Sequence, residues 1–453
     1  MLQNGGEMTS RTTGRGAVGR KPQSRRTRRS PHRSLALLVV FISALGIGTS
    51  TTQNAQTEIT PAAVRADFDA LWHYVADNYA YFDSRLTNWA AVPDLYKSDL
   101  ERVKTRSELV ALLEHVLDEL YDAHAQLTVN TPSSPRLVPS GADIWAEWQQ
   151  GRAIVEEVRE GSDAERAGMR AGAEILAVND VPIADALRTR TGRSLQHVDD
   201  NVRSWALRAV LAGYHNQQRR IRFRLGGSDF NRTVPAADQF VTQEDRLVSR
   251  TLPTNVGYIR LQESLGDSRL IPEFDSALAR HEPSAGGLIL DLRDTPGGGN
   301  TTVARAILGR FVRIEKPYQK HLLPSEERET GVRRSWLELV TPRGRSAYPQ
   351  RVVVLVGHWT GSMGEGLAIG FDAVGAATIV GTPMAQLLGA TYHFELPQSH
   401  IGINIPAEKL FHVNGTSREA FVPQVRLTRE DLSDPSGDPW MKQALKVLSN
   451  RHR

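Results

Sequence analysis

Hydrophobic and polar residues follow three successive patterns along the chain. Between residues 60 and 127, apolar and aromatic side chains recur every three or four positions, which places them on one face of a helix. The pattern is clear in AAVRADFDALWHYVADNYAYF and again in SELVALLEHVLDELYDAH, the stretch 107–124, where Ser107 is the expected N-cap. This region is predicted to form a small helical bundle.

Residues 137–240 contain shorter elements of a different kind. A strand is predicted at 153–158, a turn at 160–162, a short helix at 164–167 and a second strand at 175–178. A helical insertion at 184–218 and a last strand at 221–225 follow. The region is therefore expected to be a β-rich module with an inserted helical stretch.

From residue 252 onward, apolar strands alternate with helices. The predicted elements are 256–261, 270–279, 286–293, 301–311, 351–357, 364–374 and 377–381. Continuous apolar strands that alternate with helices are typical of a largely parallel sheet covered on both faces. Because 453 residues exceed what one hydrophobic core usually organises, the three patterns are read as separate domains.

Charge is unevenly distributed. The chain has 55 Lys and Arg against 51 Asp and Glu, but nine of these basic residues and only Glu7 lie in the first 54 positions. The remaining 46 basic and 50 acidic residues make the rest mildly acidic, which argues against a nucleic-acid partner.

An apolar run, residues 35–47, follows this basic head and precedes small and polar residues. A charged start, a short apolar stretch and a small-residue exit predict an export signal, and hence a periplasmic or extracellular protein. An uncleaved membrane anchor through residues 35–47 is the alternative, although a comfortable span needs about 20 apolar residues.

The composition also limits the chemistry. There is no cysteine, which excludes disulfides, thiolate metal sites and a cysteine nucleophile. Metal-ligand motifs such as H-E-x-x-H do not occur, so neither a metal nor a cofactor is expected.

The segment RVVVLVGHWTGSMGEGLAIGF carries a candidate nucleophile. A buried strand ends near residue 356, a tight turn follows, and Ser362 begins a helix. This order resembles the nucleophile elbow of hydrolases, which exposes a hydroxyl at the sheet edge beside free helical N–H groups. The alternative is that Ser362 only caps its helix, a common role for serine.

A glycine-rich turn, DLRDTPGGGN, follows another buried strand. Glycines allow the backbone to approach a ligand closely, so the N–H groups of Gly297 and Gly298 are predicted oxyanion donors together with that of Met363. A phosphate loop is disfavoured because no G-K-[ST] follows. Asp291 and Arg293 are predicted to form a structural ion pair beneath the turn.

A catalytic serine needs a base to accept its proton. The candidate histidines upstream and downstream of Ser362 are His115, His124, His197, His215, His393, His400 and His412. Periodicity and spacing do not choose among them.

Several stretches, in order, carry a family resemblance. They are FDALWHYVADNYAYFD, LYDAHAQL, AIVEEVREGSDAERAGMRAGAEILAVNDVPI, GYIRL, LILDLRDTPGGG, GSMGEGLAIGF, ATIVGTP and REAFVPQV. Together they resemble the S41 serine peptidases, the C-terminal processing and tricorn-like proteases, over about residues 60–430.

The resemblance implies a multidomain α/β protein. The expected parts are a basic head with an export signal or anchor, an N-terminal helical bundle, a PDZ-like β domain and a ClpP/crotonase-like α/β catalytic core. Their boundaries are placed at 1–57, 58–134, 135–245 and 246–453.

The resemblance also implies which residues act. In the processing proteases a lysine pairs with the serine, but the matching stretch here, 381–390, has no lysine. The tricorn-like branch uses a histidine after the N-terminal helices, which implies His124 as general base, and a glutamate that matches Glu419, in the network supporting the site. Ala123 stands where the tricorn protease has a serine that links its glutamate to the site.

The implied function is an extracytoplasmic serine peptidase that hydrolyses polypeptides through an acyl-enzyme on Ser362. The PDZ-like domain would recognise an extended chain, by a free C-terminus, at a groove near residues 142–148. Two alternatives remain open: a non-catalytic S41-like protein that binds peptides or ligands, and an α/β-hydrolase esterase whose base follows the serine, such as His393 or His412. The sequence does not set the oligomeric state.

Overall fold

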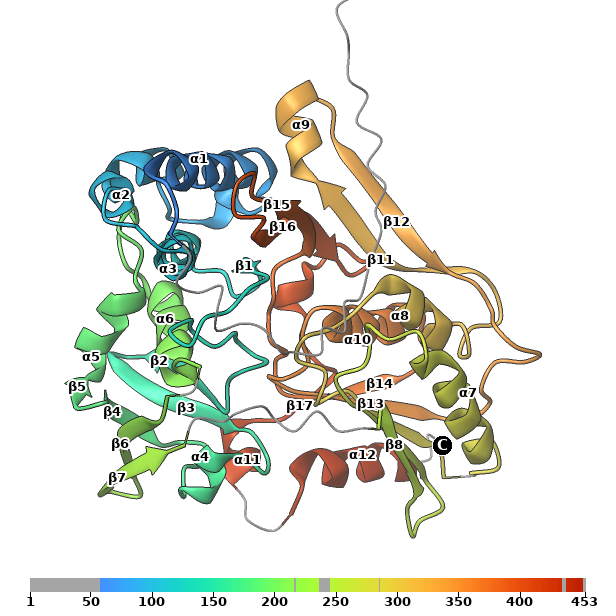
Figure 1. Cartoon of the computed structure of the whole chain (residues 1–453). Coiled ribbons are helices and arrows are strands. Elements are labelled where there is room, and N and C mark those ends of the chain that lie inside the picture. Colours follow the sequence, from blue (N-terminus) through green and yellow to red (C-terminus); the bar gives the residue numbers. More distant parts are fainter. Residues whose placement is uncertain (1–57, 216, 236–244, 285, 434–436, 451–453) are drawn as a thin grey trace, which may run out of the picture. The chain divides into compact units, whose positions relative to one another are not determined.

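The computed structural model describes residues 58–215, 217–235, 245–284, 286–433 and 437–450 (Figure 1). The predicted export signal or anchor at residues 35–47 therefore lies outside the described residues. Within the described ranges, the structure contains no helix of the length and apolar character that a membrane span requires.

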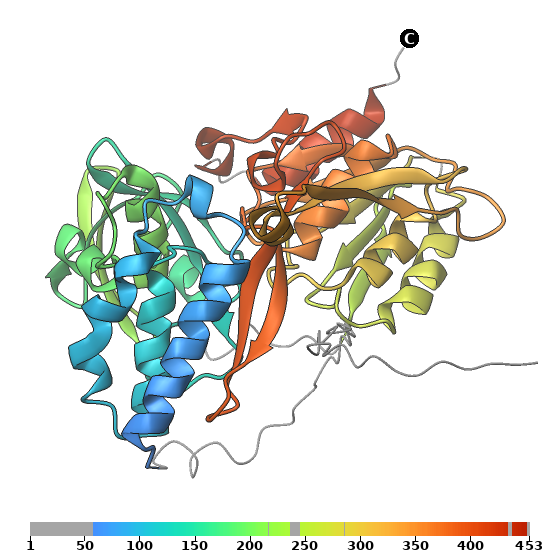
Figure 2. The ribbon, with the colours of Figure 1, turned by 90° about the horizontal axis from the view of Figure 1, so that it is seen from above.

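Three helices form the first region: α1 (Pro61–Asn78), α2 (Val92–Leu100) and α3 (Arg106–Asp118). They lie side by side, as Figure 2 shows, around an apolar core. The predicted N-cap Ser107 is wrong. Thr105 caps α3 instead, because it forms a reciprocal capping box with Glu108. The helix also ends at Asp118, earlier than predicted, so the chain leaves it in a loop that carries His124.

The second region is an antiparallel sheet, called here the β2–β7 domain. Its strand order is β2-β3-β4-β6-β7, and β5 pairs with β4. Its elements are β2 (Ile144–Gln149), β3 (Arg152–Val158), α4 (Asp163–Arg166), β4 (Glu174–Val178), β5 (Val181–Pro182), α5 (Ile183–Ala186), η3 (Leu187–Arg190), α6 (Asp200–Ala212), β6 (Arg219–Leu225) and β7 (Ser228–Val234). The predicted helical insertion is thus split into α5, η3 and α6.

The third region contains the predicted parallel sheet, in the order β17-β14-β13-β10-β9-β8, with only β8 antiparallel to its neighbour. Its strands are β8 (Leu247–Thr251), β9 (Gly257–Leu261), β10 (Leu288–Asp291), β13 (Val352–Val356), β14 (Thr378–Gly381) and β17 (Val425–Arg426). One face packs on α7 (Leu270–His281), α8 (Thr301–Leu308) and α10 (Met363–Ala373), and the other on α12 (Pro439–Ser449), as Figure 1 shows.

A further sheet, which the pattern did not predict, has the order β1-β16-β11-β12, with β15 paired to β16. Its elements are β1 (Gln126–Leu127), β11 (Lys316–Leu323), α9 (Pro324–Thr330), β12 (Arg334–Val340), β15 (Ala390–Glu395) and β16 (Gly402–Phe411). Strand β1 begins two residues after His124 and pairs Gln126 with Asn404. This pairing joins the loop after α3 to the third region.

Candidate active site

A tight turn connects β13 to Ser362. The N–H of Gly357 donates to Thr360 Oγ1 at 3.0 Å, and the Thr360 hydroxyl donates to the Leu292 carbonyl at 2.9 Å. Ser362 occupies the N-cap position of α10 with φ 49° and ψ −111°. Side-chain-bearing residues rarely adopt this conformation, which costs about 1–3 kcal/mol and is concentrated at functional sites. The turn therefore has the strained geometry expected of a nucleophile elbow.

The glycine-rich turn after β10 packs directly against this serine. Gly361 N–H donates to the Thr295 carbonyl at 3.1 Å. A Cβ on Gly298, whose φ is 70°, would lie 2.5 Å from Ser362 Cβ and 2.6 Å from the Met363 nitrogen. Only glycine fits such an approach. The structure thus brings Gly298 and Met363 beside Ser362.

The N–H groups of the glycine turn already have acceptors. Gly297 N–H donates to Glu263 Oε2 at 2.7 Å, and Gly298 N–H donates to the Thr295 carbonyl at 3.2 Å. An oxyanion at Ser362 would have to replace one of these acceptors. The roles of Gly297, Gly298 and Met363 as oxyanion donors remain predictions.

The ion pair predicted beneath the turn is confirmed. Arg293 contacts the fully buried Asp291 at 2.7 Å, and the Tyr258 hydroxyl donates to the same carboxylate at 2.8 Å. These contacts fix the point where the chain leaves β10.

Glu365 is a buried carboxylate that the sequence reasoning did not single out. It accepts the N–H groups of Ser362 at 2.9 Å, Gln386 at 2.9 Å and Leu387 at 3.2 Å. Burial raises the pKa of Glu365 to about 7, although nearby Arg418 opposes the shift. The available signal was a glutamate three residues after a serine at a helix start. Glu365 ties the backbone of Ser362 to that of Gln386 and Leu387.

His124 lies in the loop after α3 and is buried. Its Nδ1 lies 2.7 Å from the Leu388 carbonyl oxygen, and its backbone N–H donates to Asp122 Oδ1 at 2.9 Å. A carbonyl oxygen can only accept, so Nδ1 carries the proton and Nε2 presents a lone pair. Burial, with a smaller contribution from Arg418, lowers the pKa of His124 to about 4. The imidazole is therefore neutral near pH 7 and can accept a proton.

Residues 386–389, called here the 386–389 segment, connect these groups. The buried Arg418 donates to the carbonyls of Leu387 and Gly389, both at 2.8 Å, on either side of the carbonyl that receives His124. Because Glu365 holds the N–H groups at the start of the same segment, Ser362 and His124 are fastened to one short stretch of backbone. This stretch lies within 381–390, where the processing proteases have their lysine.

Behind His124, the buried Asp122 also accepts the Tyr79 hydroxyl at 2.8 Å. That hydroxyl in turn accepts from Arg85 Nε at 3.1 Å. Burial raises the pKa of Asp122. The chain of contacts anchors the loop of His124 to α1 and to the residues that follow it.

Glu419 lies in the 3₁₀ helix η4 (Arg418–Ala420), next to Arg418. Its Oε2 atom is buried and has no hydrogen-bond partner among the described residues. The Tyr81 hydroxyl is likewise buried and without a hydrogen-bond partner among these residues. Burial raises the pKa of Glu419. The hydrogen bonds of the described residues join Glu419 to neither His124 nor Ser362, and its supporting role remains a prediction.

The other candidate histidines have different surroundings. His393 Nδ1 lies 3.1 Å from Asn404 Oδ1 on an exposed strand, His400 is exposed beside Glu395, and His412 lies 3.1 Å from Asp372. None of these three contacts involves the 386–389 segment, to which His124 is hydrogen-bonded.

The β2–β7 domain contacts the turn that precedes Ser362. Glu157 lies 2.7 Å from His358 Nδ1, and Trp359 Nε1 donates to the Ala142 carbonyl at 2.8 Å. Trp145 of β2 stacks on His358 with ring centroids 4.7 Å apart. The strand of the predicted peptide groove therefore packs against the turn that precedes Ser362.

Along its length, β2 also contacts α6. Trp148 N–H donates to Ser204 Oγ at 2.9 Å, and Arg208 pairs with Glu147 at 2.7 Å. A peptide that pairs with this part of the strand would have to displace Ser204.

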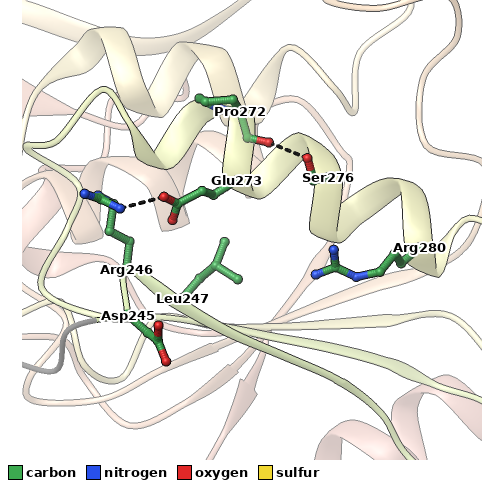
Figure 3. Close-up of a pocket in the computed structure, with 7 residues that line it drawn as sticks. All are labelled: Asp245, Arg246, Leu247, Pro272, Glu273, Ser276 and Arg280. Carbon is green, nitrogen blue, oxygen red and sulfur yellow. Dashed lines mark hydrogen bonds and ion pairs between the residues drawn. The ribbon is translucent and has the colours of Figure 1, made fainter.

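A pocket of about 350 Å³ lies elsewhere, between β8 and α7 (Figure 3). It is lined by Asp245, Arg246, Leu247, Pro272, Glu273, Ser276 and Arg280. Its lining includes two acidic and two basic residues, of which Arg246 and Glu273 contact each other at 2.5 Å. None of the candidate catalytic residues lines it.

Three family models match parts of the chain. Residues 255–426 match peptidase family S41, residues 60–118 match the tricorn protease C1 domain, and residues 154–203 match a PDZ domain. The carboxy-terminal processing protease CtpB of Bacillus subtilis (strain 168) is 23% identical over 416 residues, which cover 89% of this chain and 78% of that protein.

Solved structures share the fold. The photosystem II D1 C-terminal processing protease has a TM-score of 0.54 and 17% identity, over 86% of this chain and 98% of that one. Mature CPAF has a TM-score of 0.56 and 16% identity, over 85% and 97%. These findings confirm the family resemblance and the predicted fold class. The predicted domain boundaries and site residues remain predictions.

Proposed function

We propose that this chain, whose residues 255–426 match peptidase family S41, is a serine peptidase in which Ser362 is the nucleophile and His124 the general base. The observation that most supports this is the hydrogen bond from His124 Nδ1–H to the Leu388 carbonyl, which leaves Nε2 free to accept a proton. The 386–389 segment that receives this bond is held to the Ser362 N–H through Glu365.

The reaction follows from these groups. Ser362 Oγ attacks the peptide carbonyl while its proton passes to His124 Nε2. The oxyanion accepts the N–H of Met363 and that of Gly297 or Gly298, after one of the glycines releases its present acceptor. Collapse breaks the C–N bond, and the imidazolium protonates the leaving amine. Water, deprotonated by the same imidazole, then hydrolyses the acyl-enzyme.

Arg418 and Glu419 complete the proposed site. The positive charge of Arg418 opposes protonation of His124, so a compensating carboxylate is useful when the imidazolium forms. Glu419 is adjacent to Arg418 in sequence, and its charge would offset that of the guanidinium. This gives Glu419 a supporting electrostatic role without a direct bond to the imidazole.

Labelling of the serine tests the proposal. A fluorophosphonate probe should modify Ser362, as located by mass spectrometry, and Ser362→Ala should abolish both labelling and peptide hydrolysis. His124→Ala should lower kcat/KM by roughly 10⁴-fold. His393→Ala and His412→Ala serve as matched controls with expected wild-type rates.

Two outcomes would contradict the proposal. Loss of activity in His393→Ala or His412→Ala, with His124→Ala active, would favour the esterase-type arrangement. Peptide binding without turnover, unchanged by Ser362→Ala, would instead indicate a non-catalytic binder.

The substrate is proposed to be a polypeptide recognised by its free C-terminus. The PDZ match and the edge position of β2 support strand addition at this edge. A peptide carbonyl would replace the Ser204 hydroxyl as the acceptor of the Trp148 N–H. Titration of Ser362→Ala protein with a peptide acid and the matching amide should give tighter binding of the acid, and equal binding would contradict the proposal.

Export is proposed from the basic head and the apolar run at residues 35–47. Cell fractionation of a C-terminally tagged full chain should place it outside the cytoplasm. Recovery in the cytosol would contradict the assignment.

A further inference from the structure

The loop that carries His124 begins with two acidic residues at the C-terminal end of helix α3. Asp118 is the last residue of α3 and Glu119 its C-cap, and both are buried. The C-terminus of a helix carries partial negative charge, so carboxylates are unfavourable there. Burial adds a desolvation cost unless specific partners compensate. The partners of these two carboxylates therefore matter for how the loop is held.

Most of these partners come from residues 190–194, within the stretch that matches a PDZ domain. Arg190 contacts Asp118 through two hydrogen bonds of 2.7 and 2.6 Å, and its side chain is also buried. Glu119 accepts the backbone N–H groups of Arg193 and Ser194 and the Ser194 hydroxyl, each at 2.8 Å. The Tyr96 hydroxyl of α2 donates to Glu119 at 2.6 Å.

The fit around Glu119 is close. A Cβ on Gly192 would lie 2.4 Å from Glu119 Oε2 and 2.9 Å from its Cα. The backbone on either side is paired as well, because Ser194 carbonyl accepts from Asn88 N–H and Gln196 N–H donates to the Leu86 carbonyl, both at 3.0 Å. Residues 190–196, called here the clamp segment, thus lie between the 86–88 loop and the end of α3.

Between Glu119 and His124 the loop has little freedom. Tyr121 has a φ of 37°, unusual for an aromatic residue, and its hydroxyl accepts Leu86 N–H at 2.8 Å. Asp122 then holds the backbone N–H of His124. A displacement of the backbone at Glu119 should therefore also displace the His124 side chain, because the residues between them are held by these contacts.

We propose that the clamp segment of the PDZ domain is a positioning element for the catalytic base, acting through Asp118 and Glu119 on the loop of His124. The inference rests on the proposed function, since it takes His124 as the base. It gives the PDZ domain a second role beside substrate recognition, because the domain supplies part of the support on which the imidazole is held.

The pKa of His124 is a readout that a purely structural role would leave unchanged. Burial and Arg418 of η4 lower the pKa of His124 to about 4. The other charged groups near the imidazole are Asp122, which accepts the backbone N–H of His124, and Glu419, which is adjacent to Arg418 in sequence. If the loop moves toward water, the pKa should rise toward about 6.5, the ordinary value for histidine. The acidic limb of the activity profile should then move to higher pH, because only the neutral imidazole accepts a proton.

The test uses variants of the full chain that remain folded by circular dichroism. Gly192→Ala pushes on Glu119 without forcing an unusual backbone. Arg190→Leu removes both hydrogen bonds of Arg190 to Asp118 and leaves His115, at 3.7 Å, as the remaining partner of that carboxylate. Arg190→Lys is the conservative rescue. Arg188→Leu is the matched control, because Arg188 lies two residues before the clamp segment but is 81% exposed and forms its ion pair with the exposed Asp185.

Ring NMR titration should show the His124 pKa raised by about one unit or more in Gly192→Ala and Arg190→Leu. Fluorophosphonate labelling at pH 7, where the imidazole stays mostly neutral, should slow by about tenfold or more in these two variants because the base is misplaced, recover partly in Arg190→Lys and stay at the wild-type rate in Arg188→Leu. An unchanged His124 pKa in a folded Gly192→Ala protein would overturn the inference. A raised pKa in a chain that no probe labels would support the clamp while refuting the proposed function.

Discussion

The two sides of the candidate site are built in different ways. The nucleophile side consists of two neighbouring strands and their turns, so the register of β10 and β13 and the hydrogen bonds between the turns bring the glycine turn and Ser362 together. The base side depends on groups from three distant stretches, which are Tyr79, the clamp segment and the 386–389 segment, together with Asp122 of the same loop. The nucleophile is thus fixed by local geometry, whereas the base is fixed by tertiary contacts.

This contrast predicts that the base side is the easier one to disturb. A substitution remote from Ser362 should misplace His124 without altering the strained turn. The kinetic signature would be a fall in kcat with little change in KM, because substrate contacts remain while transition-state geometry is lost.

The largest such effect is expected for Asp122→Ala. The variant removes the acceptor for the His124 N–H and the Tyr79 hydroxyl in one step, and a misplacement of about 1 Å can cost roughly 10²-fold in rate. Steady-state kinetics on a peptide substrate should show this loss in kcat. Asp122→Asn, which keeps an acceptor oxygen, should lose much less. Equal activity of Asp122→Ala and wild type would mean that the loop is held by other contacts.

A smaller effect is expected for Glu365→Gln, which weakens the connection between the two sides. In the wild-type protein both carboxylate oxygens accept backbone N–H groups. The amide nitrogen of glutamine cannot accept, so the variant should lose about 1–3 kcal/mol in the free energy of unfolding. We expect about a tenfold fall in kcat/KM as the 386–389 segment shifts. Chemical denaturation and kinetics measure the two quantities. A stability loss with full activity would show that this connection does not matter for catalysis.

The smallest effect, of opposite sign, is expected on the nucleophile side. Glu263→Ala frees the Gly297 N–H, so an oxyanion no longer competes with a carboxylate for it, and labelling of Ser362 should quicken by about two- to tenfold. Glu160→Ala, which removes an exposed acid from a nearby loop, is the control. Slower labelling in Glu263→Ala would indicate that the carboxylate holds the turn in its active form.

The sequence allowed the nucleophile side to be predicted because its signals are local. The five apolar residues of β13, the turn residues and the glycines of the adjacent loop all occur in short windows whose geometry is set by neighbouring residues. The parallel sheet and the Asp291–Arg293 pair could be predicted for the same reason. The missed sheet of β11, β12, β15 and β16 lacks a clean alternation, as in KPYQKHLL, and its two local strand pairs are joined only by the long-range pairing of β11 with β16.

The base side could not be derived from pattern alone. Seven histidines were equivalent by spacing, and only the family resemblance favoured His124. Its physical distinction, a bond to a carbonyl 264 residues away, appears only in the folded chain. Glu365, Arg418 and the clamp segment were missed for a similar reason, since each acts on backbone groups whose positions the sequence does not display.

The central claim is that His124 Nε2 accepts the proton of Ser362. An experimental structure of the phosphonate adduct on Ser362 would test it most directly, through the distance from His124 Nε2 to Ser362 Oγ. We predict a value of about 2.6–3.2 Å, with Nδ1 still on the Leu388 carbonyl. An imidazole turned away from the adduct, with another proton acceptor beside Oγ, would contradict the account.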